Sequence, residues 1–219
     1  MFVAACPLVL ASASPRRQEL LRVLGLDFAC IPAEIDESAW PGEDAAGFAT
    51  RMAREKAGAV ARAQPAAACV IGADTVVAID GRVLGKPQNH AEALAFLSLL
   101  NGRTHTVITG YNVRVGQRGL NLSGHVRSRV QFGNFPEEVL AAYAVTPEPM
   151  DKAGAYAMQG AGCFLVRAVD GSSSNVIGLP VGELVQLLLQ QQIIGEATKS
   201  SLRCPKTIST RVERTRMAM

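Results

Sequence analysis

The sequence predicts an α/β fold built on a mixed β-sheet. Apolar and β-branched runs that suit buried strands alternate along the chain with segments whose apolar residues recur at helical spacing. Short turn sequences, such as Asp80-Gly81 and Gly116–Gly119, join several of the strands directly. Direct connections add antiparallel pairs to a sheet whose other strands are joined through helices, so we expect a mixed sheet.

The composition is that of a globular protein. Of the 219 residues, 48% are hydrophobic and 19% are charged, which excludes a disordered chain. No stretch reaches the length of a membrane span, and the N-terminus has no signal-peptide pattern, so we expect a cytoplasmic protein without a membrane partner. Scattered cysteines, odd in number, argue against a disulfide framework and favour a reducing compartment. They are Cys6, Cys30, Cys69, Cys163 and Cys204.

The formal net charge of +3 is unevenly distributed, because residues 201–219 hold much of the positive charge. The rest of the chain is close to neutral, so we expect no specific nucleic-acid binding. Residues 196–219 show no apolar period and are expected to form a flexible basic tail after a single domain at 1–195. A contact of this tail with nucleic acid or anionic lipid is the alternative to a solvated terminus.

The first element is a strand that runs through a tight turn into a helix. Leu8–Ala11 is a short apolar run, Ser14 fits a helix N-cap, and Pro15 fits the first helical position. Gly25 provides the stop. Arg16 and Arg17 stand in the first turn, where free N–H groups and the helix dipole already favour an anion. Ser12–Arg17 is therefore a candidate anion site, and a solvated first turn is the alternative.

The next elements are a short strand, a polar loop and a long helix. Residues 28–31 suit a strand, and residues 32–44 are polar, rich in turn formers and include Glu37. An amphipathic helix is expected from about Ala45 to Ala63, and Pro65 follows it. Lys56 lies among the charged residues around its apolar face.

A buried strand at Cys69–Ala73 is expected to end at Asp74, with Thr75–Ile79 continuing in extended form to a hairpin. Ligands of open α/β sheets lie at the carboxyl ends of strands. Asp74 could therefore hold a hard cation or take a proton from water, and Glu37 could complete such a metal site. A turn-capping aspartate is the alternative.

The rest of the chain continues the alternation. Glycine-rich backbone near 154–162 and 171–178 would admit a ligand closely. The expected elements are a helix from Asn89 to Leu100, strands at 104–115 and 120–132, a helix at 136–144, a strand at 164–169, a loop at 171–175, and a helix that Pro180 opens and that runs through Leu189.

Familiar site patterns are excluded. Gly81–Lys86 has the wrong spacing for a Walker A loop, and Pro87 stands where a magnesium-binding hydroxyl is needed. The histidines are widely spaced and distant in sequence from any cysteine, which argues against zinc. The remaining candidates are cations that could meet a polyanion from different sides, with ordinary surface charge as the alternative. They are Arg16, Arg17, Lys56, Lys86 and Lys152.

A series of motifs resembles the Maf family, in order and over residues 8 to about 193. The first is Ser12-Ala13-Ser14-Pro15-Arg16-Arg17-Gln18-Glu19-Leu20-Leu21. The others are Asp36-Glu37, Ala53-Arg54-Glu55-Lys56-Ala57, Gly72-Ala73-Asp74-Thr75-Val76-Val77, Gly85-Lys86-Pro87, Gly102-Arg103-Thr104-His105, Asp151-Lys152-Ala153-Gly154-Ala155-Tyr156-Ala157-Met158-Gln159-Gly160 and Val176-Ile177-Gly178-Leu179-Pro180.

The resemblance implies a nucleoside triphosphate pyrophosphatase that uses a divalent cation, Mg²⁺ or Mn²⁺, and forms a homodimer. It implies an elongated mixed sheet flanked by helices, in two lobes around a cleft, similar to inosine triphosphate pyrophosphatases. Asp74 would be the proton acceptor, and Glu37, Lys56 and Lys86 would lie at the metal and phosphate site, with Glu37 and Asp74 as metal ligands.

Substrate preference is also implied by the resemblance. The combination of Arg16, Thr75 and Gln159 resembles the branch that favours dTTP and UTP, and Gln159 has the donors and acceptor to read a pyrimidine edge. Ser12, Arg17 and Lys152 join them as candidate substrate-binding residues.

Two alternatives stay open, a 7-methyl-GTP pyrophosphatase and a nucleotide-binding regulator of septum formation that does not turn over its ligand. One departure is Gly171-Ser172-Ser173, where the family often has Gly-Ser-Tyr, so any contact of that tyrosine is absent.

Overall fold

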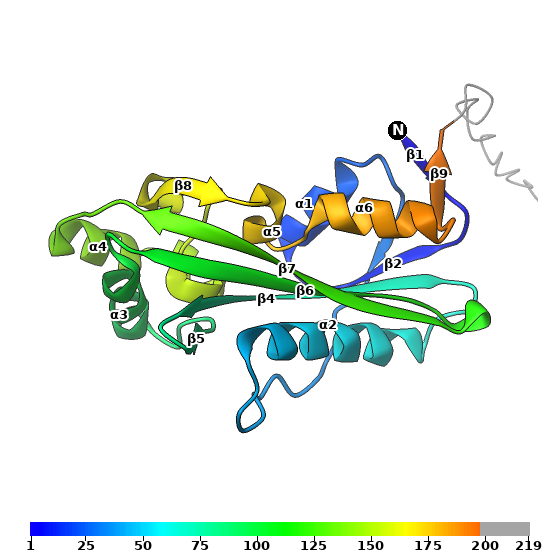
Figure 1. The fold of residues 1–219 in the computed structure, drawn as a ribbon, viewed down its shortest axis with the longest axis horizontal. Helices are drawn as coiled ribbons and strands as arrows, with labels where there is room; N and C mark the ends of the chain where they lie inside the picture. The colour runs from blue at the N-terminus through cyan, green and yellow to red at the C-terminus, as the bar shows by residue number, and fades with distance from the viewer. Residues whose placement is uncertain (198–219) are drawn as a thin grey trace, which may run out of the picture.

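A long, twisted mixed sheet runs through the computed structural model, which describes residues 1–197 (Figure 1). Within these residues the sheet has seven strands, and β2 pairs in parallel with β3 and β4, whereas the other pairs are antiparallel. The predicted mixed α/β fold is therefore confirmed. The order is β3 (Ala29–Cys30), β2 (Leu8–Ala11), β4 (Cys69–Ile79), β6 (Thr104–Val115), β7 (Leu120–Phe132) and β8 (Val166–Asp170), with β5 (Arg82–Leu84) paired to β4.

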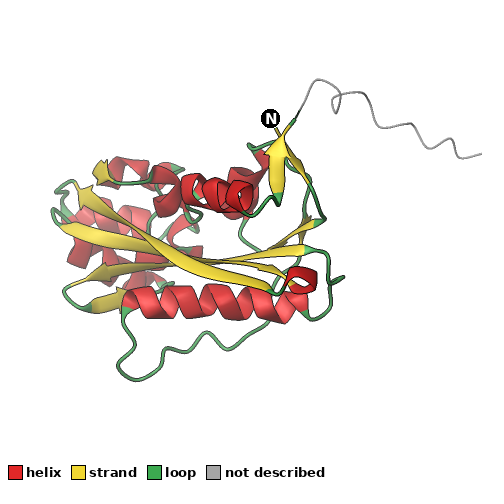
Figure 2. Ribbon diagram, turned by 45° about the vertical axis from the view of Figure 1, so that its right-hand side comes forward, coloured by secondary structure: helices red, strands yellow, loops and turns green. Residues whose placement is uncertain are grey.

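Helices cover both faces of this sheet (Figures 1 and 2). The long helix α2 lies along one face, and α1 and α6 lie on the other, while α3 and α4 pack together at one end. The helices are α1 (Pro15–Arg22), α2 (Ala45–Ala61), α3 (His90–Leu100), α4 (Glu137–Ala144), α5 (Ser173–Ile177) and α6 (Val181–Gln190). Short 3₁₀ turns are η1 (Gly116–Arg118), η2 (Glu148–Asp151), η3 (Ala153–Ala155) and η4 (Ala161–Leu165).

Alternation along β4 explains why both faces of the sheet are apolar. Cys69, Ile71 and Ala73 pack against α1 and α6, whereas Val70 and Val76 pack beneath α2. A second cluster fills the other end of the sheet, around α3 and α4. Leu97, Leu100, Phe132, Leu140 and Leu165 are among its fully buried members.

Two glycines bring α2 unusually close to the sheet. A Cβ atom at Gly72 would overlap the carbonyl oxygen of Ala53, and one at Gly110 would overlap the backbone of Ala49. The missing side chains allow backbone-to-backbone approach. The polar end of Lys56, on the same helix, therefore reaches the middle of β4.

The structure corrects several boundaries of the prediction. Asp74 does not end a strand but lies in the middle of β4, where its charge is balanced by Lys56. The stretch 171–175, expected as a loop, begins α5, because Ser172 Oγ accepts a hydrogen bond from the Asn175 N–H and caps the helix. The strand expected at 164–169 starts only at Val166, after η4. The second helix ends at Ala61 rather than at 63.

A small two-stranded sheet near the termini was not predicted from the sequence. β1 (Phe2–Ala4) pairs with β9 (Ile194–Glu196) in antiparallel register. Glu196 therefore belongs to the folded body instead of to the predicted tail. Ala197 is described as well, and residues 198–219, the rest of the predicted tail, lie outside the described residues. None of the helices among residues 1–197 has the length and apolar character needed to cross a bilayer.

Candidate functional site

A cleft of about 560 Å³ opens between the N-terminus of α1, the middle of β4 and the segment 151–159. All ten residues that the sequence nominated line this one cleft, although they come from six separate parts of the chain. They are Ser12, Arg16, Arg17, Glu37, Lys56, Asp74, Thr75, Lys86, Lys152 and Gln159.

Lys56 bridges two carboxylates inside the cleft. Its Nζ atom lies 2.6 Å from Asp74 Oδ1 and 2.9 Å from Glu37 Oε1. Lys56 and Asp74 are each 8% exposed, so this pair is shielded from solvent. The contact between Lys56 and Asp74 follows from the close approach of α2 to β4. Glu37 reaches Lys56 from the exposed loop before α2.

Positive charge in the cleft lowers the pKa of Glu37. Burial raises the pKa of this carboxyl group, but the hydrogen bond from Lys56 and the charges of Lys56, Lys86 and Arg17 outweigh that effect. Glu37 is therefore a carboxylate at neutral pH. The side chain of Lys86 is thus electrostatically part of the site, although Lys86 is exposed.

The two neighbouring arginines have different partners. Arg17 Nε donates to the Gly178 carbonyl at 2.7 Å, and its Nη atoms donate to Thr75 Oγ1 at 3.0 Å and Ser12 Oγ at 3.4 Å. Burial lowers the pKa of Arg17, and the charge of Asp74 opposes that shift. Arg17 therefore ties α1, β4 and the end of α5 together at the floor of the cleft.

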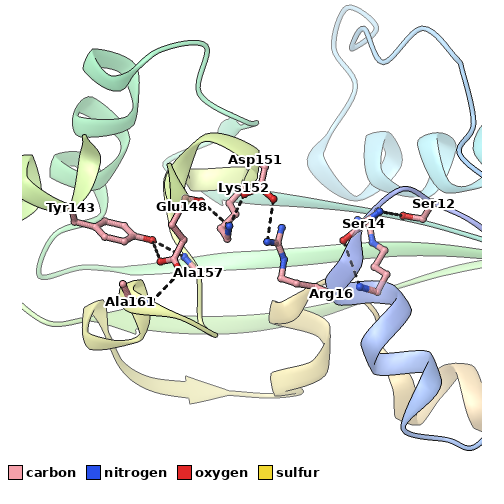
Figure 3. Close-up of polar contacts among 10 residues, drawn as sticks. Ser12, Ser14, Arg16, Tyr143, Glu148, Asp151, Lys152, Ala157 and Ala161 are labelled. Carbon is pink, nitrogen blue, oxygen red and sulfur yellow. Dashed lines mark hydrogen bonds and ion pairs between the residues drawn. The ribbon is translucent and has the colours of Figure 1, made fainter. Parts of the chain in front are cut away.

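Arg16, by contrast, spans the cleft. Its Nη1 atom lies 3.3 Å from Asp151 Oδ2 on the opposite wall (Figure 3). Lys152 Nζ lies beside the same carboxylate, 2.5 Å from Oδ1, and also donates to the Glu148 carbonyl at 2.7 Å. Asp151 is mostly exposed, so its bond to Arg16 is open to exchange with an anionic ligand.

Comparison with known proteins shows which family the chain belongs to. A family model described as Maf-like protein matches residues 7–191. The chain belongs to the Maf family. The resemblance inferred from the sequence motifs is therefore confirmed.

Several relatives of this Maf chain are named dTTP/UTP pyrophosphatase. The dTTP/UTP pyrophosphatase of Myxococcus xanthus (strain DK1622) is 51% identical over 181 residues, which cover 83% of this chain and 90% of that protein. The dTTP/UTP pyrophosphatase of Syntrophus aciditrophicus (strain SB) is 47% identical over 181 residues, 83% of this chain and 88% of that one. The structure of the Staphylococcus aureus Ham1 protein superposes with a TM-score of 0.49 at 15% identity, covering 85% of this chain and 99% of that one.

The donor set of the Maf cleft suits a hard cation that shares its coordination with a ligand. Among residues 1–197 no group of three or more His, Cys, Asp or Glu side chains is gathered for a metal ion. Glu37 and Asp74 nevertheless present two carboxylates with a cationic ammonium group already between them. Mg²⁺ is commonly held by one or two carboxylates plus substrate phosphates, so this pair fits such an ion.

Three glycines in the segments 154–162 and 171–178 of this Maf chain make room for neighbouring side chains. A Cβ atom at Gly154 would crowd Val77, one at Gly171 would crowd Ser128, and one at Gly160 would overlap Glu148 Oε1. These three glycines accommodate the chain's own side chains, whereas Gln159 and Gly178 of the same segments line the cleft. Close approach of a ligand to these segments stays a prediction.

Sequence reasoning missed one residue that anchors the Glu37 loop of the Maf site. Arg51 on α2 donates to both carboxylate oxygens of Glu43, at 2.7 and 2.6 Å, and to the Ser38 carbonyl at 2.9 Å. Its guanidinium also lies 4.1 Å from the centre of the Trp40 ring. Spacing alone could not reveal these contacts, because the loop between residues 32 and 44 has no periodicity.

Proposed function

We propose that this Maf protein is a nucleoside triphosphate pyrophosphatase that hydrolyses dTTP and UTP to the nucleoside monophosphate and pyrophosphate. Its relatives named dTTP/UTP pyrophosphatase, at 42–51% identity over most of the chain, support this reaction. The observation that carries the proposal is the Asp74–Lys56–Glu37 bridge, set in a cleft that further cations line.

Asp74 is the proposed proton acceptor. A water molecule attacks the α-phosphorus, its proton passes to an Asp74 carboxylate oxygen, and the bond from the α-phosphorus to the bridging oxygen breaks. Pyrophosphate leaves with the bridging oxygen, and the water oxygen remains on the monophosphate. Lys56 holds the Asp74 carboxylate in place through its 2.6 Å contact.

The proposed phosphate site consists of Lys56, Lys86, Arg16 and Lys152. Cations at fixed positions lower the energy of a triphosphate whose charge shifts during in-line displacement. Arg16 suits bidentate phosphate contact, and the lysines act as point charges. Arg16 has to exchange Asp151 for phosphate when the substrate enters.

Glu37 and Asp74 would hold a divalent cation, Mg²⁺ or Mn²⁺. Such an ion, when bound, draws electron density from phosphate oxygens. We expect that EDTA abolishes turnover and that added Mg²⁺ or Mn²⁺ restores it.

Base preference is assigned to Gln159, Thr75 and Arg16. Gln159 is exposed at the cleft wall and offers a carbonyl and two N–H donors to a pyrimidine edge. The Thr75 hydroxyl shares hydrogen bonds with Thr109 and Arg17, so it keeps a small, fixed surface under the base. Ser12 and Arg17 would shape the floor of the same pocket.

The homodimer, the cytoplasmic location and the single domain over 1–195 stay predictions from the sequence. Light scattering after size-exclusion chromatography tests the dimer, and limited proteolysis tests the domain boundary.

A nucleotide panel tests the reaction. The protein and Mg²⁺ are incubated with dTTP, UTP, dGTP and 7-methyl-GTP, and pyrophosphate and orthophosphate are assayed separately. We expect pyrophosphate from dTTP and UTP without orthophosphate. Orthophosphate as the first product would contradict the bond assignment, and a preference for 7-methyl-GTP would contradict the substrate assignment. Binding without any product would instead indicate a nucleotide-binding regulator.

A further inference from the structure

One wall of the cleft contains neither α-helix nor strand. Residues 151–159 pass from η2 through η3 toward η4, and they carry Lys152 and Gln159. Sheet hydrogen bonds do not fix this wall. The Gly154 N–H donates to the Gly85 carbonyl at 3.0 Å and holds its first part, so the part from Ala157 onward depends on side-chain contacts with its backbone. Those contacts come from the segment directly before it, which ends α4 and forms η2.

The carboxylate of Glu148 and the hydroxyl of Tyr143 hold the backbone of this wall at Ala157 and Ala161 (Figure 3), before and after Gln159 in the sequence. Glu148 accepts hydrogen bonds from the N–H of Ala161 at 3.0 Å and of Gly162 at 2.8 Å. Tyr143 donates its hydroxyl to Glu148 at 2.7 Å and accepts from the N–H of Ala157 at 3.3 Å. We call this set the Glu148–Tyr143 clamp.

Two glycines let the clamp close. Gly160 has φ of +111°, a conformation that side chains rarely adopt, and a Cβ atom there would overlap Glu148 Oε1. A Cβ atom at Gly162 would overlap the Tyr143 hydroxyl. The backbone on the C-terminal side of Gln159 is thus shaped around the clamp.

Glu148 also contacts Lys152, the basic side chain that this wall contributes to the cleft. Its backbone carbonyl accepts the hydrogen bond of Lys152 Nζ at 2.7 Å. Burial raises the pKa of the Glu148 carboxyl, but hydrogen bonds from Tyr143, Gly162 and Ala161 and the charge of Lys152 outweigh it. Glu148 is therefore a carboxylate at neutral pH, the form that accepts three hydrogen bonds at once.

We propose that Glu148 is a positioning residue that sets the base preference of this enzyme. Through the Glu148–Tyr143 clamp it holds residues 157–162 so that Gln159 faces the cleft at a fixed distance from Lys152. The inference rests on the proposed function and on the assignment of Gln159 as the residue that reads the base. Glu148 itself touches no substrate.

The test is Glu148→Gln in the full chain, with kcat/KM measured for dTTP and dGTP. The amide keeps the size of the side chain but turns an N–H group toward donors that need an acceptor. We expect the ratio of kcat/KM for dTTP over dGTP to fall about tenfold, because the loss of one hydrogen bond to a charged group has an effect of about this size. Glu138→Gln, an exposed residue on the first turn of α4, is the matched control and keeps the ratio.

A double variant separates positioning from a general loss of structure. If Glu148 acts through Gln159, then Glu148→Gln adds no further change to the ratio in a Gln159→Ala background. Tyr143→Phe removes only the hydroxyl and is expected to lower the ratio in the same direction. It decides the matter if Glu148→Gln does not fold.

The results that would overturn this inference differ from the result that would overturn the proposed function. An active wild-type enzyme whose Glu148→Gln and Tyr143→Phe variants fold and keep the wild-type ratio would overturn this inference alone. An additive effect in the Gln159→Ala background would also overturn it, because Glu148 would then act elsewhere. A wild-type protein that releases no pyrophosphate would overturn the proposed function and this inference with it.

Discussion

The ammonium group of Lys56 keeps two carboxylates in a cleft that has to accept a polyanion. Without a cation between them, Asp74 and Glu37 would repel each other and the phosphates. With Nζ at 2.6 Å from one and 2.9 Å from the other, the cluster carries a single net negative charge. A divalent cation between carboxylates and phosphates would add to this compensation.

Asp74→Asn tests the role of the proton acceptor. The amide keeps the shape of the side chain but cannot take a proton from water, so we expect kcat to fall by about 10²- to 10⁴-fold. Pyrophosphate release under saturating dTTP measures it, and the melting temperature checks that the fold is intact.

Asp80→Asn is the matched control, because Asp80 lies on the exposed hairpin turn and pairs with Arg103 outside the cleft. It is expected to keep full turnover. Normal turnover of Asp74→Asn would show that another group accepts the proton.

The arginine pair at the start of α1 shows what a sequence can predict about a residue and what it cannot. Ser14, Pro15 and the two arginines correctly predicted the helix start and its N-cap. The side chains of the two arginines have different partners, because Arg17 donates hydrogen bonds to Gly178 and Thr75, whereas Arg16 pairs with Asp151. These partners are distant in sequence, so local patterns carry no information about them.

The site forms around the middle of β4. The sequence predicted that a buried strand ends at Asp74 and that Thr75–Ile79 continues in extended form. The predicted end was wrong, because the strand runs on through Asp74 and α2 supplies Lys56 opposite that position. The hydrophobic periods of the sequence predict α2 and β4 separately. The contact between them depends on Gly72 and Gly110, and the sequence alone does not show that the α2 backbone packs against these two glycines.

Gly72→Ala tests the close packing of α2 on β4. The added methyl group would overlap the Ala53 carbonyl, so α2 has to move away and carry Lys56 with it. We expect a loss of about 1–3 kcal/mol in the free energy of unfolding, measured in urea, together with lower turnover.

Gly182→Ala, in the exposed part of α6 with nothing within 4 Å of the new Cβ atom, is the contrast. It is expected to be neutral or to stabilise by up to about 1 kcal/mol. Equal stability of Gly72→Ala and wild type would mean that α2 does not need its close approach.

Two large apolar clusters lie at the two ends of the sheet, one around α1 and α6 and the other around α3 and α4, and two smaller ones lie beneath α2. The cluster around α3 and α4 contains a polar residue, His105, which is 2% exposed. Its Nε2 atom lies 2.8 Å from the hydroxyl of Tyr156, which lines the cleft. The imidazole packs edge-to-face against Phe132 and Tyr156, so the stability of this cluster depends on the protonation of His105.

Burial lowers the pKa of His105 from 6.5 to about 4. In the unfolded chain the ring takes a proton near pH 6.5, whereas in the folded protein it stays neutral until about pH 4. The unfolded state therefore binds more protons between these values, and stability rises with pH through this window and is complete above it. At about 1.4 kcal/mol per pH unit, acidification from pH 7.5 to 5 should cost about 2 kcal/mol.

Urea unfolding at pH 7.5 and pH 5 measures this difference. We expect His105→Gln to be less stable than wild type at pH 7.5 but to lose much less on acidification, because no proton is taken up at this position. His125→Gln, an exposed histidine on β7, should keep the wild-type difference. A His105→Gln protein that still loses about 2 kcal/mol would place the titrating group elsewhere.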